Sequence, residues 1–394
     1  MRIGYLTYGL DRAPTGIGRY AVELLRALGS LPDAPEIVLL TTEREDRHDL
    51  WTRFEQHSLP GCRLLPALMT IGNLALSAAT RRYGLDLLHD PNGIAPFFGP
   101  RAGARRIVTI HDAFAFVYPE THNRLDNWRY HTMLARAACR ADMVLTDSEH
   151  SRQDLKRYLA IPDANIRLVP CGLDPRFQPI ADGSERRAAL ERYNITAPYL
   201  LYVGGINARK NIARLFEAFA QVRQRHSGLK LVIGGKRQWQ TDEIDATFER
   251  LALHEHVHFT GYLDDRDLPA LYSAAEVFVF PSLYEGFGLP PLEAMACGAP
   301  VVTSNASSLP EVVGDAALTV DPYNVAELAA AIERALTDEP LRAELRQRGI
   351  ARAQQFTWRR AARDVAEVYA RLLGRAADGT MLEQIPPDRQ RLAP

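Results

Sequence analysis

The residues best suited to chemistry stand in one string, FPSLYEGFGLPPLEAMACG, which runs from Phe280 to Gly298. We expect a buried strand to end at Pro281 and a glycine loop to follow it. A helix should begin near Pro290, where a missing N–H costs nothing, and stop at Gly298. Such a loop directs its N–H groups and the positive end of the helix at one place, which suits an anionic pyrophosphate. The N–H groups concerned are those of Gly286, Phe287, Gly288 and Leu289.

Two glutamates belong to this string. Glu285 lies in the loop and Glu293, eight positions later, lies early in the helix, so both can face the same ligand. A carboxylate in that position can accept hydrogen bonds from two hydroxyls of a ribose or a hexose. The alternative is a capped helix that carries two surface acids.

The string resembles the glutamate-x7-glutamate signature of retaining glycosyltransferases of family 4. The resemblance continues through residues 299–304 and 308–312 and, in looser form, extends to about Leu373. It implies the GT-B fold, in which two Rossmann-like domains face each other across a cleft. It also implies that Glu285 contacts the donor sugar and that Glu293 binds the nucleotide ribose.

A second cluster, GGINARKN, occupies residues 204–211 between a strand and a helix. Gly205 belongs to the turn, and Arg209 and Lys210 place two adjacent cations at the carboxyl end of a sheet. Cleavage of a nucleotide sugar leaves further negative charge on a phosphate, which adjacent cations stabilise. The alternative is a solvated loop with ordinary basic residues. The family match favours the first interpretation, because the family's phosphate-binding Arg and Lys fall at this loop.

His111 stands at the end of a buried strand in the first half of the chain, in the string TIHDAF. A lone histidine at a strand end is as often structural as functional. In the resembling family a histidine here lines the donor-sugar pocket and is needed for turnover, and His111 is the match. Asp112 could orient the imidazole or could cap the turn.

The string TGIGRYA, with Gly16, Ile17 and Gly18, fits G-x-G-x-x-A and raises the alternative of a nicotinamide-dependent oxidoreductase. Spacing argues against it, because a dinucleotide fingerprint puts its first glycine at the strand's end, whereas the first strand should stop near Thr7. Glu43 would be late for the ribose acid. In the resembling family this loop instead abuts the donor phosphates and the acceptor. A GT-B sugar-nucleotide epimerase is a further alternative.

Three weaker patterns do not change the interpretation. Asp265 and Asp267 resemble a metal-binding D-x-D but should cap a helix at 267–275. The three histidines 254, 256 and 258 lack a companion carboxylate for a metal site. The arginines at 101, 105 and 106 should form a solvated edge that could touch anionic lipid. No metal is therefore expected.

The elements around these motifs alternate strand and helix almost throughout, which predicts an α/β chain of two doubly wound parallel sheets. We expect a first domain at 1–178, a second at 179–355, a helix at 359–373 that packs back on the first domain, and a disordered tail at 375–394. In the first domain we expect strands at 2–7, 36–41, 86–89, 106–111, 143–146 and 166–169, and helices at 18–28, 125–139 and 149–159. A linker should occupy 172–198 and contain a helix at 185–193. In the second domain we expect strands at 199–203, 229–233, 257–260, 277–280, 300–303 and 317–320, and a helix at 212–222.

Composition excludes several classes of protein. Lys plus Arg total 47 and Asp plus Glu total 48 of 394 residues, so the net charge of -1 argues against a nucleic-acid binder. The four cysteines form no C-x-x-C pair and read as reduced thiols. No stretch is long and apolar enough to span a bilayer, and no signal peptide is evident. We expect a cytoplasmic protein, which could also bind peripherally at the inner face of the plasma membrane.

The family resemblance implies a retaining transfer of a hexose from a nucleotide diphosphate to a hydroxyl acceptor. The strings TGIGRY, HD with Phe114, and SSLPE at 307–311 look most like bacterial mannosyltransferases that build surface polysaccharide such as lipopolysaccharide. That implies GDP-mannose as substrate, with a UDP-hexose or GDP-rhamnose as the alternative donor. The acceptor would be a glycan or a lipid-linked glycan. No cofactor is expected.

Overall fold

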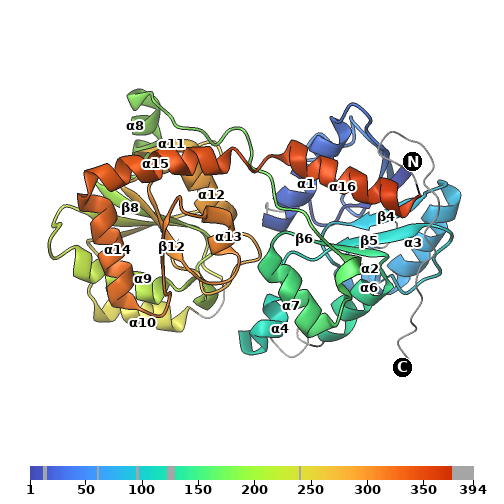
Figure 1. Ribbon diagram of the computed structural model, residues 1–394, viewed down its shortest axis with the longest axis horizontal. Coiled ribbons are helices and arrows are strands. Elements are labelled where there is room, and N and C mark those ends of the chain that lie inside the picture. The colour runs from blue at the N-terminus through green and yellow to red at the C-terminus, as the bar shows by residue number, and fades with distance from the viewer. Residues whose placement is uncertain are drawn as a thin grey trace.

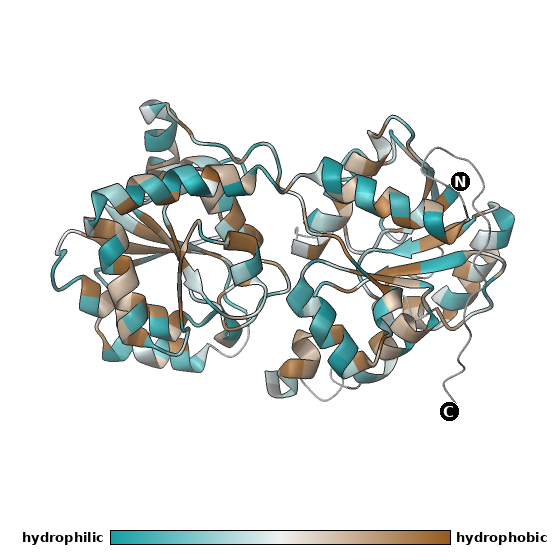
Figure 2. Ribbon diagram, viewed as in Figure 1, coloured by the Kyte–Doolittle hydropathy of each residue, from teal (hydrophilic) through white to brown (hydrophobic). Residues whose placement is uncertain are grey.

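Short apolar runs form the strands and amphipathic segments form the helices that connect them. The computed structural model describes residues 1–11, 16–59, 62–94, 97–121, 128, 130–238 and 241–374. Two parallel sheets, each flanked by helices, lie side by side in Figure 1. The strands are apolar and buried between helices whose outer faces are hydrophilic (Figure 2). This is the GT-B architecture.

The first sheet has the strand order β3-β2-β1-β4-β5-β6-β7, and every neighbouring pair is parallel. Its strands are β1 (Arg2–Leu6), β2 (Glu36–Thr41), β3 (Glu55–Ser58), β4 (Leu87–Asp90), β5 (Arg105–Thr109), β6 (Met143–Thr146) and β7 (Ile166–Leu168). Its helices are α1 (Gly16–Gly29), α2 (Leu65–Met69), α3 (Ile71–Arg82), α4 (Phe114–Val117), α6 (Ala135–Arg140) and α7 (Glu149–Leu159). The order reverses between β1 and β4, and ligands of such sheets bind beyond the carboxyl ends of the strands there.

The second sheet has the order β10-β9-β8-β11-β12-β13 and is also parallel throughout. Its strands are β8 (Tyr199–Val203), β9 (Lys230–Gly234), β10 (Val257–Gly261), β11 (Val277–Phe280), β12 (Val301–Ser304) and β13 (Leu318–Val320). Its helices are α8 (Gly183–Arg192), α9 (Ile212–Val222), α10 (Asp242–Arg250), α11 (Leu268–Ala274), α12 (Leu289–Ala296), α13 (Leu309–Val313), α14 (Val325–Thr337) and α15 (Glu339–Ala353). The reversal here falls between β8 and β11.

The last helix, α16 (Trp358–Leu372), leaves the second sheet and lies beside α1 on the first (Figure 1). The ring of Trp358 contacts the ring of Tyr20 in α1, with centroids 5.7 Å apart. The Tyr369 hydroxyl lies 2.6 Å from Nδ1 of His89 in β4. Because Tyr369 and His89 are both buried, α16 is part of the first sheet's core.

Two segments differ from the sequence expectations. The strand β3 was not expected, and it pairs in parallel with β2 at the edge of the first sheet. The expected helix at 125–139 is a π-helix at Tyr130–Leu134 followed by α6, and its first residues lie outside the described ones. The expected tail at 375–394 also lies outside the described residues.

Candidate active site

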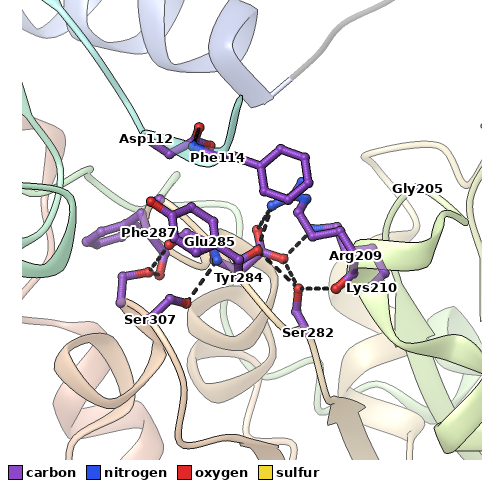
Figure 3. Close-up of polar contacts among 12 residues, drawn as sticks. Asp112, Phe114, Gly205, Arg209, Lys210, Ser282, Tyr284, Glu285, Phe287 and Ser307 are labelled. Carbon is purple, nitrogen blue, oxygen red and sulfur yellow. Dashed lines mark hydrogen bonds and ion pairs between the residues drawn. The ribbon is translucent and has the colours of Figure 1, made fainter. Parts of the chain in front are cut away.

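Glu285 is the centre of the charged cluster at the end of β11. Its carboxylate contacts Nζ of Lys210 at 2.5 Å and Nη1 of Arg209 at 3.1 Å (Figure 3). The Ser282 hydroxyl donates to the same carboxylate at 2.5 Å. Glu285 is 7 % exposed and Lys210 is 8 % exposed, so a carboxylate and an ammonium are buried together. The alternative of a solvated loop with ordinary basic residues is therefore wrong for Lys210.

Burial and pairing have opposite effects on these charges. Burial alone would raise the pKa of Glu285, but Arg209 and Lys210 outweigh it and hold that pKa below its ordinary value. Burial and the neighbouring Arg209 lower the pKa of Lys210 to about 8. Glu285 is therefore a fixed anion at neutral pH, and Lys210 is a cation that sheds its proton more readily than an exposed lysine.

The loop between β8 and α9 places the two cations. The Asn207 side chain accepts a hydrogen bond from the Lys210 N–H at 3.3 Å, which closes the turn that contains Arg209. Asn211 has φ 60° and donates from its side chain to the Pro281 carbonyl at 3.0 Å. This contact ties the loop after β8 to the loop after β11. The cations thus meet Glu285 because two neighbouring strands end at one edge of the sheet.

The glycine loop after β11 closely approaches the first half of the molecule. A Cβ on Gly286 would lie 2.4 Å from the His111 carbonyl oxygen, so only glycine fits there. Gly288 has φ 117° at the N-terminus of α12, which begins at Leu289 as the proline pair predicts. The Phe287 ring packs against Phe356 with centroids 5.7 Å apart, so its side chain belongs to the core.

His111 follows β5 and faces Asp147, which follows β6. Its Nδ1 lies 2.6 Å from Oδ2 of Asp147, and its Nε2 lies 2.9 Å from the Pro91 carbonyl oxygen. Burial lowers the pKa of His111, but the Asp147 carboxylate, the Pro91 carbonyl and Asp112 together outweigh burial and raise that pKa above its ordinary value. Asp112 does not orient the imidazole, because its Oδ1 accepts from the Phe114 N–H at 3.0 Å and caps the turn.

Glu293 is held by a residue from the other half of the chain. Arg19 of α1 donates from Nη1 to Glu293 at 2.9 Å and from Nη2 to Asp265 at 2.6 Å. The Tyr272 hydroxyl donates to the second carboxylate oxygen of Glu293 at 3.0 Å. Glu293 is 4 % exposed, and burial raises its pKa despite the Arg19 charge. A ribose at Glu293 would have to displace or share these donors.

Gly16, Ile17 and Gly18 form the first turn of α1, one position before Arg19. β1 ends at Leu6, which leaves Gly16 too far along the chain for a dinucleotide fingerprint. Ile17 and Gly18 line a cavity of about 350 Å³ that Asp265 and Asp174 close from the other side. A second cavity, about 270 Å³, has Phe114 and Arg209 among its lining residues. Gly205, at the turn after β8, abuts the Gln238 side chain.

Two further contacts join the halves beside the glycine loop. The Tyr284 hydroxyl donates to Oδ2 of Asp154 in α7 at 2.7 Å. The two carboxylate oxygens of Glu311 accept from the Glu149 and His150 N–H groups at the start of α7, both at 2.7 Å. A carboxylate at a helix N-terminus is stabilised by the unpaired N–H groups and the dipole.

The rejected patterns resolve in three ways. Asp267 stands at the start of α11 without capping it, because its carboxylate binds Arg192 and the Tyr193 hydroxyl. Arg106 is not solvated but buried, and it donates to the carbonyls of Phe97, Gly99 and Pro100. Within the described ranges no group of three or more His, Cys, Asp or Glu side chains could hold a metal ion.

Sequence reasoning missed three site residues. Asp147, Arg19 and Ser282 all contact a residue that it had selected, namely His111, Glu293 and Glu285. Asp147 could have been found, because it follows a buried strand directly beside the strand that carries His111. Arg19 could not, since its partners lie in the other half of the chain.

Comparison with known proteins agrees with this geometry. Residues 14–177 match the family described as Glycosyltransferase Family 4, and residues 186–355 match the one described as Glycosyl transferases group 1. O-antigen chain mannosyltransferase B of Escherichia coli is 34 % identical over 94 % of this chain and 99 % of its own length. MMP alpha-(1->4)-mannosyltransferase of Mycolicibacterium hassiacum is 31 % identical over 76 % and 74 % of the two chains. The sucrose-phosphate synthase structure from Thermosynechococcus elongatus superposes with a TM-score of 0.76 at 26 % identity, covering 94 % of this chain and 98 % of that one.

The two facing sheets and the charged loops at their strand ends define a glycosyltransferase of the GT-B class. The chain belongs to glycosyltransferase family 4. The alternative of a nicotinamide-dependent oxidoreductase is therefore wrong, and Glu43 instead accepts from the Thr7 hydroxyl and the Leu10 N–H.

Proposed function

We propose that this enzyme transfers mannose from GDP-mannose, with retention of configuration, to a hydroxyl of a glycan acceptor in the synthesis of a surface polysaccharide. The observation that carries the proposal is the buried cluster of Arg209, Lys210 and Glu285 at the end of β11. The choice of mannose as the transferred sugar is supported by the two mannosyltransferase relatives, one of which is named for an O-antigen chain. A UDP-hexose or GDP-rhamnose is the alternative donor.

The charges of the cluster suit a diphosphate leaving group. Arg209 and Lys210 would meet the phosphates, and the N–H groups of residues 286–289 at the start of α12 would complete the anion site. The negative charge of the donor favours the protonated form of Lys210, whose pKa of about 8 already leaves it mostly protonated at neutral pH. The predicted roles of Glu285 on the hexose and Glu293 on the ribose belong to the same proposal.

The chemistry would need no protein nucleophile. The donor C1–O bond breaks as the acceptor oxygen attacks from the same face, and the leaving phosphate takes the acceptor's proton. The protein then neutralises charge and fixes orientation, which is what a rigid, buried cation pair can supply. His111, which follows β5 of the first sheet, is the proposed contact for the donor sugar.

The acceptor is proposed to enter the cavity between α1 and Asp265. Its volume of about 350 Å³ accommodates a sugar ring, and its walls combine apolar residues such as Leu10 and Val22 with polar ones such as Glu23 and Asn92. Apolar walls with a few polar groups are typical of small-molecule sites.

A lipid-linked acceptor implies contact with a membrane surface. No helix in the described part of the chain is long and apolar enough to cross a bilayer. Leu64, Ile71 and Leu74 are nevertheless 69 %, 62 % and 67 % exposed at α2 and α3, and α3 ends in the exposed pair Arg81 and Arg82. Apolar side chains next to basic ones suit an anionic lipid surface. Serine at the three apolar positions should reduce flotation with anionic vesicles without changing transfer to a soluble acceptor.

A nucleotide-sugar panel tests the proposed donor. GDP-mannose, GDP-rhamnose, UDP-glucose and UDP-N-acetylglucosamine are each added to the enzyme, and the shift in Tm and the transfer to octyl α-mannoside are measured. A ligand that binds only the folded state stabilises it by mass action. GDP-mannose should give both the largest shift and the fastest transfer. Faster transfer from a UDP-sugar would refute the donor assignment.

A further inference from the structure

The imidazole of His111 lies between two hydrogen-bond acceptors supplied by neighbouring strands. β4, β5 and β6 are adjacent and parallel, so the residues that follow them gather at one edge of the sheet. Asp147 follows β6, His111 follows β5 and Pro91 follows β4. The ring of Tyr20 packs edge-on against the imidazole, with centroids 4.6 Å apart. The ring is thus held in one plane.

Both ring nitrogens face acceptors. Oδ2 of Asp147 lies 2.6 Å from Nδ1, and the Pro91 carbonyl oxygen, which can only accept, lies 2.9 Å from Nε2. A neutral imidazole has one donor and one acceptor nitrogen, so it would direct a lone pair at one of these oxygens. An imidazolium donates from both nitrogens and satisfies both contacts.

The remaining possibility is that Asp147 carries the proton and donates it to a neutral imidazole. The ordinary pKa of imidazole, about 6.5, exceeds that of a carboxyl group, about 3.9, so the proton belongs on the ring. Other titratable groups nearby are Asp112 in the same loop, which favours the cation, His89 in β4, the Cys171 thiol, which hydrogen-bonds to Asp147, and the Tyr20 hydroxyl. Burial raises the pKa of both Cys171 and Tyr20, so both are neutral. Burial and the charge of His111 lower the pKa of His89 to about 3, so His89 is neutral and does not compete.

We propose that Asp147 is a positioning residue that holds His111 in the site as a doubly protonated cation. Asp147 is 3 % exposed and contacts the His111 imidazole, so we assign it a role that acts through that ring. The imidazolium and the Asp147 carboxylate then form an ion pair that fixes both the plane and the charge of the ring. A ring held in this way offers the proposed donor sugar a local positive charge that a neutral histidine lacks.

The direct test is nitrogen-15 NMR of the imidazole in the unliganded enzyme between pH 6 and 9, which does not depend on the identity of the donor. The His111 signals are assigned by their loss in His111→Ala. Both ring nitrogens should show the shifts of protonated nitrogen at pH 7. Asp147→Asn keeps the volume of the side chain and removes its charge, so His111 should titrate at least one pH unit lower than in the wild type. At any given pH, that shift lowers the ratio of protonated to neutral imidazole by about tenfold. Asp112→Asn is the matched control and should change that titration much less.

A second readout separates this role from a structural one and rests on the proposed function. At low pH the kcat of Asp147→Asn should approach that of the wild type. As the pH rises, this kcat should begin to fall at a lower pH than in the wild type, while the KM for GDP-mannose changes little. A loss of kcat that is independent of pH would overturn the positioning role. A neutral, single-tautomer His111 in the wild type at pH 7 would overturn the proposal even if transfer from GDP-mannose is confirmed. Failure of all transfer with a doubly protonated His111 would refute the proposed function alone.

Discussion

Lys210 offers the sharpest perturbation of the proposed anion site. Its Nζ is buried 2.5 Å from Glu285 and 4.9 Å from the centre of the Phe280 ring, so Lys210→Met removes the charge and keeps most of the packing. Loss of one preorganised donor at developing charge typically costs about 3 kcal/mol of barrier, or about a hundredfold in rate. Single-turnover transfer from GDP-mannose measures that loss without interference from product release.

The same substitution should also destabilise the fold, because Glu285 loses one of its partners. Breaking a buried pair costs roughly 3–5 kcal/mol, and the remaining contacts of Glu285 with Arg209 and Ser282 favour the lower end. The double variant Lys210→Met, Glu285→Gln removes both charges, so urea unfolding should show recovered stability. A near-normal rate in Lys210→Met, or recovery of the rate together with stability, would refute the phosphate role.

Three further predictions concern the surroundings of the site. Glu293→Ala should weaken GDP binding by about 1.5–3 kcal/mol in calorimetry, because a charged hydrogen-bond pair is lost. Arg19→Ala should instead tighten GDP binding, because it frees Glu293 from its ion pair. Weaker GDP binding in both variants would contradict a competition between Arg19 and the ribose for Glu293. The pKa of His89 is about 3 in the fold, so the unfolded chain binds its proton first and stability falls as pH drops below about 6.5. Between pH 7 and pH 5, urea unfolding should show the wild type losing about 2 kcal/mol of stability relative to His89→Gln; an equal pH dependence in the two proteins would contradict a neutral His89. Transfer should persist in excess EDTA. Loss of transfer in EDTA, followed by its restoration with magnesium, would contradict protein cations as the charge-neutralising groups.

Much of the fold could be predicted from the sequence because buried parallel strands are short apolar runs between helices. The strands at 36–41, 143–146, 199–203 and 277–280 begin and end where the pattern indicates. β3 has the sequence EQHS, which contains no apolar residue, and backbone pairing with β2 holds it at the sheet edge. Hydrophobic periodicity cannot detect such a strand, because it buries no apolar face.

The site could be predicted only as far as local strings describe it. The strings placed Arg209, Lys210 and Glu285 in two loops, and the structure brings them within hydrogen-bond distance. Their burial was not predictable, because it depends on loops 75 or more positions apart in the chain. Arg106 was misjudged for the same reason, since the carbonyls that solvate it come from a loop whose path no periodicity reveals.

The most direct test of the central claim is the anomeric configuration of the first product formed from GDP-α-mannose and octyl α-mannoside. Proton NMR of the reaction mixture follows the new anomeric signal as it appears, in the wild type and in Lys210→Met. An α-linked mannoside should form in the wild type and should form far more slowly in the variant. A β-linked product, or a sugar delivered only from a donor other than GDP-mannose, would contradict that claim.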